Sequence, residues 1–273
     1  MTSSISPDVP VPGDPARRRI LGVRVDDVTW PEALARIDAF VASGQPHHVV
    51  TPNPELVMLA RRDPAFRAVL AQADLAPADG VGLRWAGRLL GQPIRAVVPG
   101  SDLIERMAER AGPRGDRWFL LGAAEGVADA VGRVLTARHP GLVVAGTWSG
   151  SPRDADADAI CRRIEAAAPV DALFVAFGSP AQELWIARHQ PRLRIPVAVG
   201  VGGGFNFVAG RSRRPPAVVG RLHLIWLFRL LTEPWRWRRQ LRLVGFGCAV
   251  VREALGRWRG GDRAVARHAP GAG

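Results

Sequence analysis

Two short polar loops contain the side chains best suited to proton transfer. Asp79 lies on the turn Pro77-Ala-Asp-Gly80, between an apolar run and a helical stretch. A carboxylate on such a turn, among apolar neighbours, can serve as a general base with a modestly raised pKa. Thr51 and Asn53, in Thr51-Pro-Asn-Pro-Glu55, can hydrogen-bond a sugar or phosphate at a strand end. A simpler interpretation stays open for both loops, in which these polar residues only cap the helices that follow.

Three glycine-containing loops follow predicted strands, and two of them are candidates for contact with a diphosphate. Gly122-Ala-Ala-Glu-Gly126 and Gly178-Ser-Pro-Ala-Gln-Glu183 each follow a predicted strand and open a predicted helix, which presents backbone N–H groups to phosphate. Neither has the Gly-Lys-Ser/Thr ending of a Walker loop. The third loop, Gly200-Val-Gly-Gly-Gly-Phe205, has Phe205 where a dinucleotide-binding fingerprint has its third glycine. A dinucleotide-dependent oxidoreductase therefore fits poorly.

We expect no metal ion and no cofactor. Asp154-Ala-Asp-Ala-Asp158 resembles the Asp-x-Asp motif of many sugar transferases, but it stands at a predicted helix start, where acidic residues interact well with the helix dipole. The six histidines show no ligand spacing. Cys161 and Cys248 lie far apart and form no Cys-x-x-Cys motif, which excludes a disulfide scaffold and fits a reducing compartment.

An alternation of short apolar runs and amphipathic stretches must position these loops. Thr29-Trp-Pro-Glu32 predicts a capping box and a helix to about Val41, and Ser101 and Asp154 are predicted to cap two further helices. The alternation predicts a Rossmann-like α/β domain over residues 20–210, with a mostly parallel sheet and helices on both faces. Ligands bind such sheets beyond the carboxyl ends of the strands. The predicted strands are His48–Thr51, Leu75–Ala78, Trp118–Leu121, Leu142–Ala145, Ala172–Phe177 and Val197–Val201.

The positive charge is concentrated near the C-terminal end. All 37 basic residues are Arg, and the formal net charge is +12. Residues 211–273 hold 14 of these arginines and three acidic residues, a net charge of +11. The same segment contains Trp226, Trp235, Trp237 and Trp258. Arg and Trp beside apolar residues favour docking on an anionic membrane surface, although a solvated charged face explains the charge alone. We predict a helical, membrane-docking appendage over residues 211–259.

Composition excludes several classes of protein. Hydrophobic residues make up 47%, charged residues 23%, and the mean hydropathy is +0.02, values typical of a globular domain. No apolar run approaches the roughly 18–20 residues that cross a bilayer. Residues 1–19 predict a disordered leader without a signal peptide, and residues 260–273 a disordered tail. We therefore expect a cytoplasmic protein.

The motifs also occur in a recognisable order. The loops at 51–55, 77–80, 178–183 and 200–205 are joined by Pro99-Gly-Ser-Asp102, Phe119-Leu-Leu-Gly122 and Arg229-x4-Pro234-x-Arg236. With this set and spacing, residues 20–244 closely resemble the WecG/TagA/CpsF family of bacterial glycosyltransferases (glycosyltransferase family 26). The sequence departs from the family pattern at Leu224-Ile-Trp226, Arg239-Gln240 and Asn206, where relatives usually carry Glu-Trp, Arg-Tyr and Asp. These differences affect the expected identity of the donor and acceptor more than the expected activity.

The resemblance implies an inverting, metal-independent transfer of N-acetylmannosamine or a related sugar. The donor would be a UDP-sugar and the acceptor a polyprenyl-diphosphate-linked saccharide, in polysaccharide or wall polymer synthesis. It implies that Asp79 is the general base, with Thr51 and Asn53 beside it, and that arginines neutralise the departing UDP. The implied substrate-binding residues are Gln182, Glu183, Gly122, Gly178, Gly202, Gly203, Arg229, Arg236 and Arg239.

The implied protein is peripheral on the inner face of the plasma membrane, and a homo-oligomer is compatible with it. Two alternatives stay open. One is a non-catalytic, membrane-docked subunit of a polysaccharide assembly complex that binds a nucleotide sugar. The other is a nucleic-acid-binding protein that uses the Arg- and Trp-rich tail. It leaves the α/β loops unexplained, so we expect no nucleic-acid partner.

Overall fold

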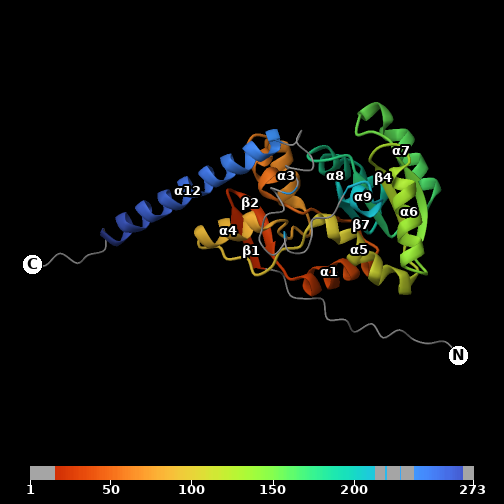
Figure 1. Cartoon of the computed structure of the whole chain (residues 1–273), viewed down its shortest axis with the longest axis horizontal. Helices are drawn as coiled ribbons and strands as arrows, with labels where there is room; N and C mark the ends of the chain where they lie inside the picture. Colours follow the sequence, from red (N-terminus) through yellow and green to blue (C-terminus); the bar gives the residue numbers. More distant parts are fainter. Residues whose placement is uncertain (1–15, 213–218, 220–227, 229–236, 267–273) are drawn as a thin grey trace, which may run out of the picture.

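A five-stranded parallel sheet forms the centre of the protein, in the strand order β3-β7-β6-β4-β5 (Figure 1). The computed structural model describes residues 16–212, 219, 228 and 237–266. All four neighbouring strand pairs are parallel, which confirms the predicted Rossmann-like α/β class. The strands are β3 (His47–Val49), β4 (Arg117–Gly122), β5 (Val143–Trp148), β6 (Ala172–Ala176) and β7 (Val197–Gly200).

Helices cover both faces of this sheet because its strands are apolar on both sides. Trp118 and Leu120 of β4 pack on one face, and Phe119 and Leu121 pack on the other, as successive strand residues must. The first face is covered by α1 (Trp30–Ser43), α5 (Gly100–Ala111), α6 (Val127–Arg138) and α9 (Gly204–Val208). The second is covered by α7 (Asp154–Ala166) and α8 (Ala181–Leu193). A short 3-10 helix, η1 (Gly112–Arg114), follows α5.

A third apolar cluster joins the chain's C-terminal helix to its N-terminal part. It contains residues of the antiparallel hairpin β1 (Ala16–Ile20) and β2 (Val23–Asp27), and of α2 (Pro54–Ala60), α3 (Pro64–Gln72) and α4 (Val81–Leu89). Phe246, Val250 and Ala254 of α12 (Trp237–Ala266) are buried in the same cluster.

Polar contacts fix α12 on this cluster. Arg242 pairs with Glu55 at 2.6 Å, and Arg257 donates to the Leu90 carbonyl at 2.8 Å. Figure 1 shows the rest of α12 projecting beyond the body. The helix runs to Ala266, past residue 259, so part of the predicted disordered tail is helical.

Several predicted boundaries were wrong. Leu75–Ala78 is not a regular strand: it forms two isolated parallel bridges, Val49 to Leu75 and Asp26 to Pro77, and Pro77 has no N–H for a ladder. Ser101 does not cap α5, which begins at Gly100 after Pro99. Asp154 is the first helical residue of α7, whose N-cap is Arg153. The capping box at Thr29 is confirmed, since its N–H donates to Glu32 at 2.7 Å.

One further strand has different bounds from those predicted. The strand expected at Leu142–Ala145 is β5, which runs on to Trp148. No helix within the described residues has the length and apolarity needed to cross a membrane.

Candidate active site

The predicted site loops gather at one edge of the sheet. Because β3, β4, β6 and β7 are parallel, the loops that follow them all leave from their carboxyl ends. From β4 the chain continues through α6 to β5, whereas from β6 it continues through α8 to β7 on the other side. The two neighbouring strands therefore send their helices in opposite directions, to opposite faces. Such a switch in strand order opens the crevice in which α/β proteins bind ligands.

The turn that carries Asp79 is held by backbone hydrogen bonds on both sides. The Asp79 N–H donates to the Pro52 carbonyl at 2.7 Å, and the Val98 N–H donates to the Ala78 carbonyl at 2.8 Å. Asp79 itself is half-buried. It does not cap α4, because the N-cap residue is Gly80, whose φ is 100°. The capping interpretation of Asp79 is therefore wrong.

A buried ion pair between Arg24 and Asp26 contacts the segment that leads into the same turn. Asp26 is fully buried and accepts two hydrogen bonds from Arg24, both at 2.8 Å. The same carboxylate accepts from the Ala76 N–H at 2.8 Å, and Arg24 donates to the Ala73 carbonyl at 2.6 Å. Sequence reasoning missed this pair, although the alternation Val23-Arg-Val-Asp-Asp27 places Asp26 out of phase with the two valines.

Thr51 and Asn53 have different surroundings. Asn53 is the N-cap of α2, and its Oδ1 accepts from the Leu56 N–H at 3.0 Å. The simple capping interpretation is thus confirmed for Asn53. The cap bond uses the amide oxygen of Asn53 and not its amide nitrogen. Thr51 is 8% exposed and lies against Gly100, where an added Cβ would be 2.4 Å from the Thr51 hydroxyl. Glycine at position 100 therefore lets the start of α5 approach Thr51.

Three of the motif loops are connected to the Asp79 turn by a chain of close contacts. The 51–55 loop touches the Asp79 turn through the Pro52 carbonyl and through Pro54, which would be 2.8 Å from a Cβ at Gly82. The 99–102 loop touches Thr51 through Gly100 and touches the 200–205 loop through Ser101, whose Cα would be 3.6 Å from a Cβ at Gly204. These contacts bring Asp79 and Thr51 into one site with the glycine run.

Gln182 joins the loops that follow β6 and β7. It is 3% exposed, and its Oε1 accepts from the Gly178 N–H at 3.1 Å and from the Gly202 N–H at 3.0 Å. Its Nε2 donates to the carboxylate of Glu183 at 2.9 Å. The N–H groups of Gly178 and Gly202 are thus already bonded to Gln182 rather than open to a phosphate. Whether these four residues bind substrate remains a prediction.

The loops after β4 and β6 touch at the switch in strand order. Gly122 has a φ of 102°, and a Cβ there would lie 2.8 Å from the Ala176 carbonyl carbon. The next residue, Ala123, has a φ of 64°, and its N–H donates to the Ala176 carbonyl at 3.0 Å. Gly203 precedes α9 as its N-cap residue. The left-handed turn at Gly122 and Ala123 directs the chain away from β6 toward α6.

Arg229 and Arg236 lie outside the described residues, and Arg239 lies in α12 at a position whose side chain is not described. The acidic motif at 154–158 carries ion pairs: Asp154 with Arg188, Asp156 with Arg153, and Asp158 with Arg192. Among the described residues, no three His, Cys, Asp or Glu side chains are grouped to hold a metal ion.

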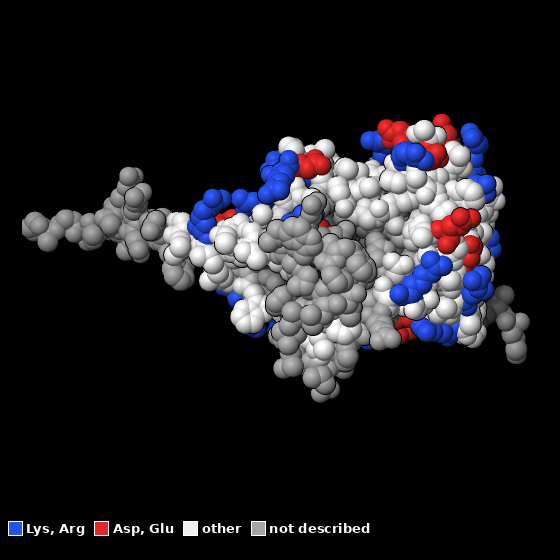
Figure 2. Space-filling model, turned by 45° about the horizontal axis from the view of Figure 1, so that its top comes forward, with Lys and Arg blue, Asp and Glu red and all other residues white. Residues whose placement is uncertain are grey.

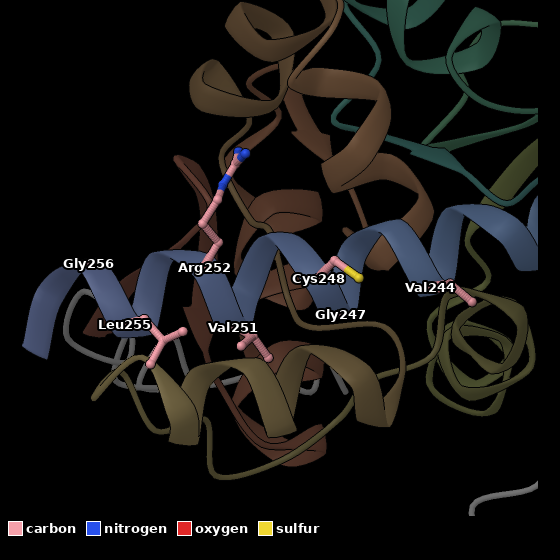
Figure 3. A pocket seen from close by; sticks show the side chains of 7 residues that line it. All are labelled: Val244, Gly247, Cys248, Val251, Arg252, Leu255 and Gly256. Carbon is pink, nitrogen blue, oxygen red and sulfur yellow. The ribbon is translucent and has the colours of Figure 1, made fainter.

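Acidic and basic side chains are mixed on the α/β part, whereas α12 has exposed apolar side chains near Arg252. In Figure 2, acidic and basic side chains lie next to one another along the right-hand margin of the α/β part. Figure 3 shows Val251 and Leu255 pointing to one side of α12 and Arg252 to the other. Val244, Val251 and Leu255 are 65%, 50% and 45% exposed. The described part of α12 thus has exposed apolar side chains on one side and Arg252 on the other; membrane docking by the appendage stays a prediction.

Comparisons with known proteins give one consistent match. The family model described as "Glycosyl transferase WecG/TagA/CpsF family" matches residues 18–260. An N-acetylglucosaminyldiphosphoundecaprenol N-acetyl-beta-D-mannosaminyltransferase of Bacillus spizizenii is 37% identical over 205 residues, which are 75% of this chain and 78% of that protein. A protein of the same name from Staphylococcus aureus is 33% identical over 230 residues, covering 84% and 88%. The matched range includes every motif loop described above.

Proposed function

The chain belongs to the WecG/TagA/CpsF family of glycosyl transferases, and we propose that it transfers N-acetylmannosamine from a UDP-sugar to a polyprenyl-diphosphate-linked N-acetylglucosamine. The names of the similar Bacillus and Staphylococcus proteins support both the sugar and the type of acceptor. The observation that carries the proposal is the turn of Asp79. Backbone bonds hold it next to the 51–55 loop, which contacts the 99–102 loop and through it the glycine run. This arrangement supports a site at the carboxyl ends of the strands, where α/β proteins bind ligands.

In the proposed reaction Asp79 is the general base. Its carboxylate takes the proton from an acceptor hydroxyl, whose oxygen forms a bond to C1 of the donor sugar. The bond from C1 to the diphosphate oxygen breaks, UDP leaves from the opposite face, and the configuration at C1 inverts. General-base assistance of this kind contributes typically ~10²–10⁴-fold. The fixed backbone around Asp79 supports this role, because it limits the positions that the carboxylate can take.

The charge of the UDP leaving group requires cations that the site loops do not contain. The six loops at 51–55, 77–82, 99–102, 122–126, 178–183 and 200–205 include five acidic residues and no Arg. We assign this role to the arginines of the appendage, Arg229, Arg236 and Arg239, because a guanidinium binds phosphate in a bidentate manner. Helix N-termini at this edge, such as that of α8, add further stabilisation. The proposed transfer uses no metal ion.

Membrane docking would bring these arginines to the lipid acceptor. Residues 211–273 carry a net charge of +11, and the described part of α12 combines basic residues with exposed Val244, Val251 and Leu255. Such a surface binds anionic membranes through both charge and apolar burial. The proposed site of action is therefore the inner face of the plasma membrane.

The test is acceptor-dependent UDP release from a panel of UDP-sugars, with a short-chain polyprenyl-diphosphate-N-acetylglucosamine acceptor and with or without EDTA. We expect Asp79→Asn to lose about 10²-fold or more in kcat, and activity to survive EDTA. The matched control is Asp154→Asn, an exposed Asp of the metal-like motif, which should keep full activity. Release unchanged by Asp79→Asn would remove Asp79 as the base. UDP binding without release from any donor would instead favour the non-catalytic binding subunit.

A further inference from the structure

Glu183 is a buried carboxyl whose two oxygens have unequal surroundings. The residue is 2% exposed. Its Oε1 accepts from the Ser179 hydroxyl at 2.7 Å and from Gln182 Nε2 at 2.9 Å. Its Oε2 is buried and has no hydrogen-bond partner among the described residues. An ionised oxygen left in that position would be strongly unfavourable, because nothing replaces its lost hydration.

The surroundings of Glu183 contain no compensating cation within the part of the chain that the structure describes. The strands beneath it, β6 and β7, carry only apolar residues and glycine. Farther along α8, Arg188 and Arg192 pair with acidic residues of α7, and His189 packs on Trp185. No ion pair joins Glu183 to a charged residue of α3 or α7 there. Burial raises the pKa of Glu183, and the side-chain hydrogen bonds from Ser179 and Gln182, with one backbone hydrogen bond, only partly oppose this.

The partner of Glu183 is the residue that fastens two site loops together. Gln182 Oε1 gathers the N–H groups of Gly178 and Gly202 only while its Nε2 points at Ser179 and Glu183. The amide of Gln182 packs closely against Gly200 of β7, since a Cβ at Gly200 would lie 2.6 Å from Gln182 Nε2. An acceptor at Glu183 Oε1 therefore fixes which way the Gln182 amide faces.

We propose that Glu183 is a positioning residue that works in its protonated form, with the proton on Oε2, and that it orients Gln182 to hold the β6 and β7 loops together. The proton removes a negative charge from the edge where, under the proposed function, the diphosphate of the donor binds. Like charges would otherwise weaken that binding. Neutral Glu183 thus gives the Gln182 amide an acceptor without repelling the nucleotide.

The test compares Glu183→Gln, which keeps the shape and the Oε1 acceptor without a charge, with Glu183→Ala, which removes the acceptor. Glu109→Gln, an exposed residue of α5, is the matched control. Thermal unfolding is followed from pH 5 to 8.5, and UDP affinity is measured by calorimetry at pH 6 and 8. Above pH 4.5 a buried neutral Glu retains a proton that the unfolded chain releases, so wild-type stability falls as pH rises toward the folded pKa.

The stability of Glu183→Gln should not fall in this way, because the Gln side chain does not titrate. Its Tm relative to wild type should therefore rise by roughly 3–5 °C for each pH unit over that range, whereas Glu109→Gln should show no such trend. We expect the UDP affinity of Glu183→Gln to stay within about threefold of wild type, and that of Glu183→Ala to fall about tenfold.

Three results would overturn the proposal: a Tm difference that does not change with pH, a Gln variant that loses as much affinity as the Ala variant, or a Gln variant that fails to fold. Failure of the wild-type protein to bind UDP would instead contradict the proposed function. The Tm profile would still decide the protonation of Glu183 in that case.

Discussion

The buried pair of Asp26 and Arg24 offers a direct test of how the Asp79 turn is held. Asp26 is fully buried, and the Arg24 side chain is 11% exposed. The Asp26 carboxylate also accepts from the N–H of Ala76, three residues before Asp79. Asp26→Asn leaves a largely buried guanidinium without its counter-charge, although the amide oxygen can still accept from Ala76.

Breaking one side of a buried ion pair costs about 3–5 kcal/mol. In a chain of this length each kcal/mol lowers the Tm by about 2–4 °C, so we expect a fall of about 6–20 °C. The matched control is Asp158→Asn. Its partner Arg192 is 2.7 Å away, close to the 2.8 Å of the buried pair, but the two side chains are 76% and 44% exposed. The loss of this exposed pair should therefore cost less than about 1 kcal/mol.

The assays are urea and thermal unfolding, followed by sugar transfer at a temperature at which all variants are folded. Because the 73–76 segment leads directly into the Asp79 turn, we expect kcat of Asp26→Asn to fall by up to about 10²-fold. The KM for the donor should change less, since the loops after β6 and β7 are held by other bonds. If Asp26→Asn unfolds within about 1 kcal/mol of Asp158→Asn, the buried pair does not support the turn as argued.

Substitutions at three further positions test other parts of the site and its support. Gly200→Ala should displace the Gln182 amide and weaken UDP binding about tenfold by calorimetry, whereas Gly256→Ala on α12, with open space around it, should leave binding unchanged. Burial lowers the pKa of His48 from 6.5 to about 4, so stability present above pH 6.5 should fall by about 3 kcal/mol as pH drops to 4. Urea unfolding of wild type and His48→Gln at pH 7 and 4.5 checks this, and equal losses in both would contradict it. Asn53→Ala should lose about 1 kcal/mol from the α2 cap and Asn53→Asp should not; if Asn53→Asp also loses activity while stable, the amide nitrogen has a second role.

The architecture was predictable because the central strands β4, β6 and β7 are apolar along almost their whole length. An apolar strand requires cover on both faces of the sheet. The segments Trp118–Leu121 and Ala172–Phe177 correspond to β4 and β6, and helices pack on both faces of these two strands. The 75–78 segment was not predictable in the same way. It is as apolar as the true strands, but Asp26 and Val49 bond to it from opposite sides through isolated bridges. Local sequence does not encode which distant strand a segment will meet.

The motifs selected the candidate site residues, but they did not show how these residues contact one another. From the sequence, Gln182, Gly178 and Gly202 appear as three separate contacts for a ligand. Gln182 in fact accepts hydrogen bonds from both glycines. This arrangement depends on the register of β6 against β7, which pairs Val175 with Gly200 and brings residues twenty positions apart together. No pattern within either loop encodes that register.

The distribution of charge explains why the C-terminal segment must take part in the proposed reaction. The six site loops contain five acidic residues and no Arg, so an anionic diphosphate would meet net repulsion there even with Glu183 neutral. The arginines of residues 211–273 can reverse that balance. A truncation after Gly210 would be a poor test of this argument, because it would also remove Phe246, Val250 and Ala254 from an apolar cluster of the body. Charge-neutralising substitutions such as Arg229→Gln and Arg236→Gln separate the two effects, since they leave α12 packed while removing the cations proposed to bind the diphosphate.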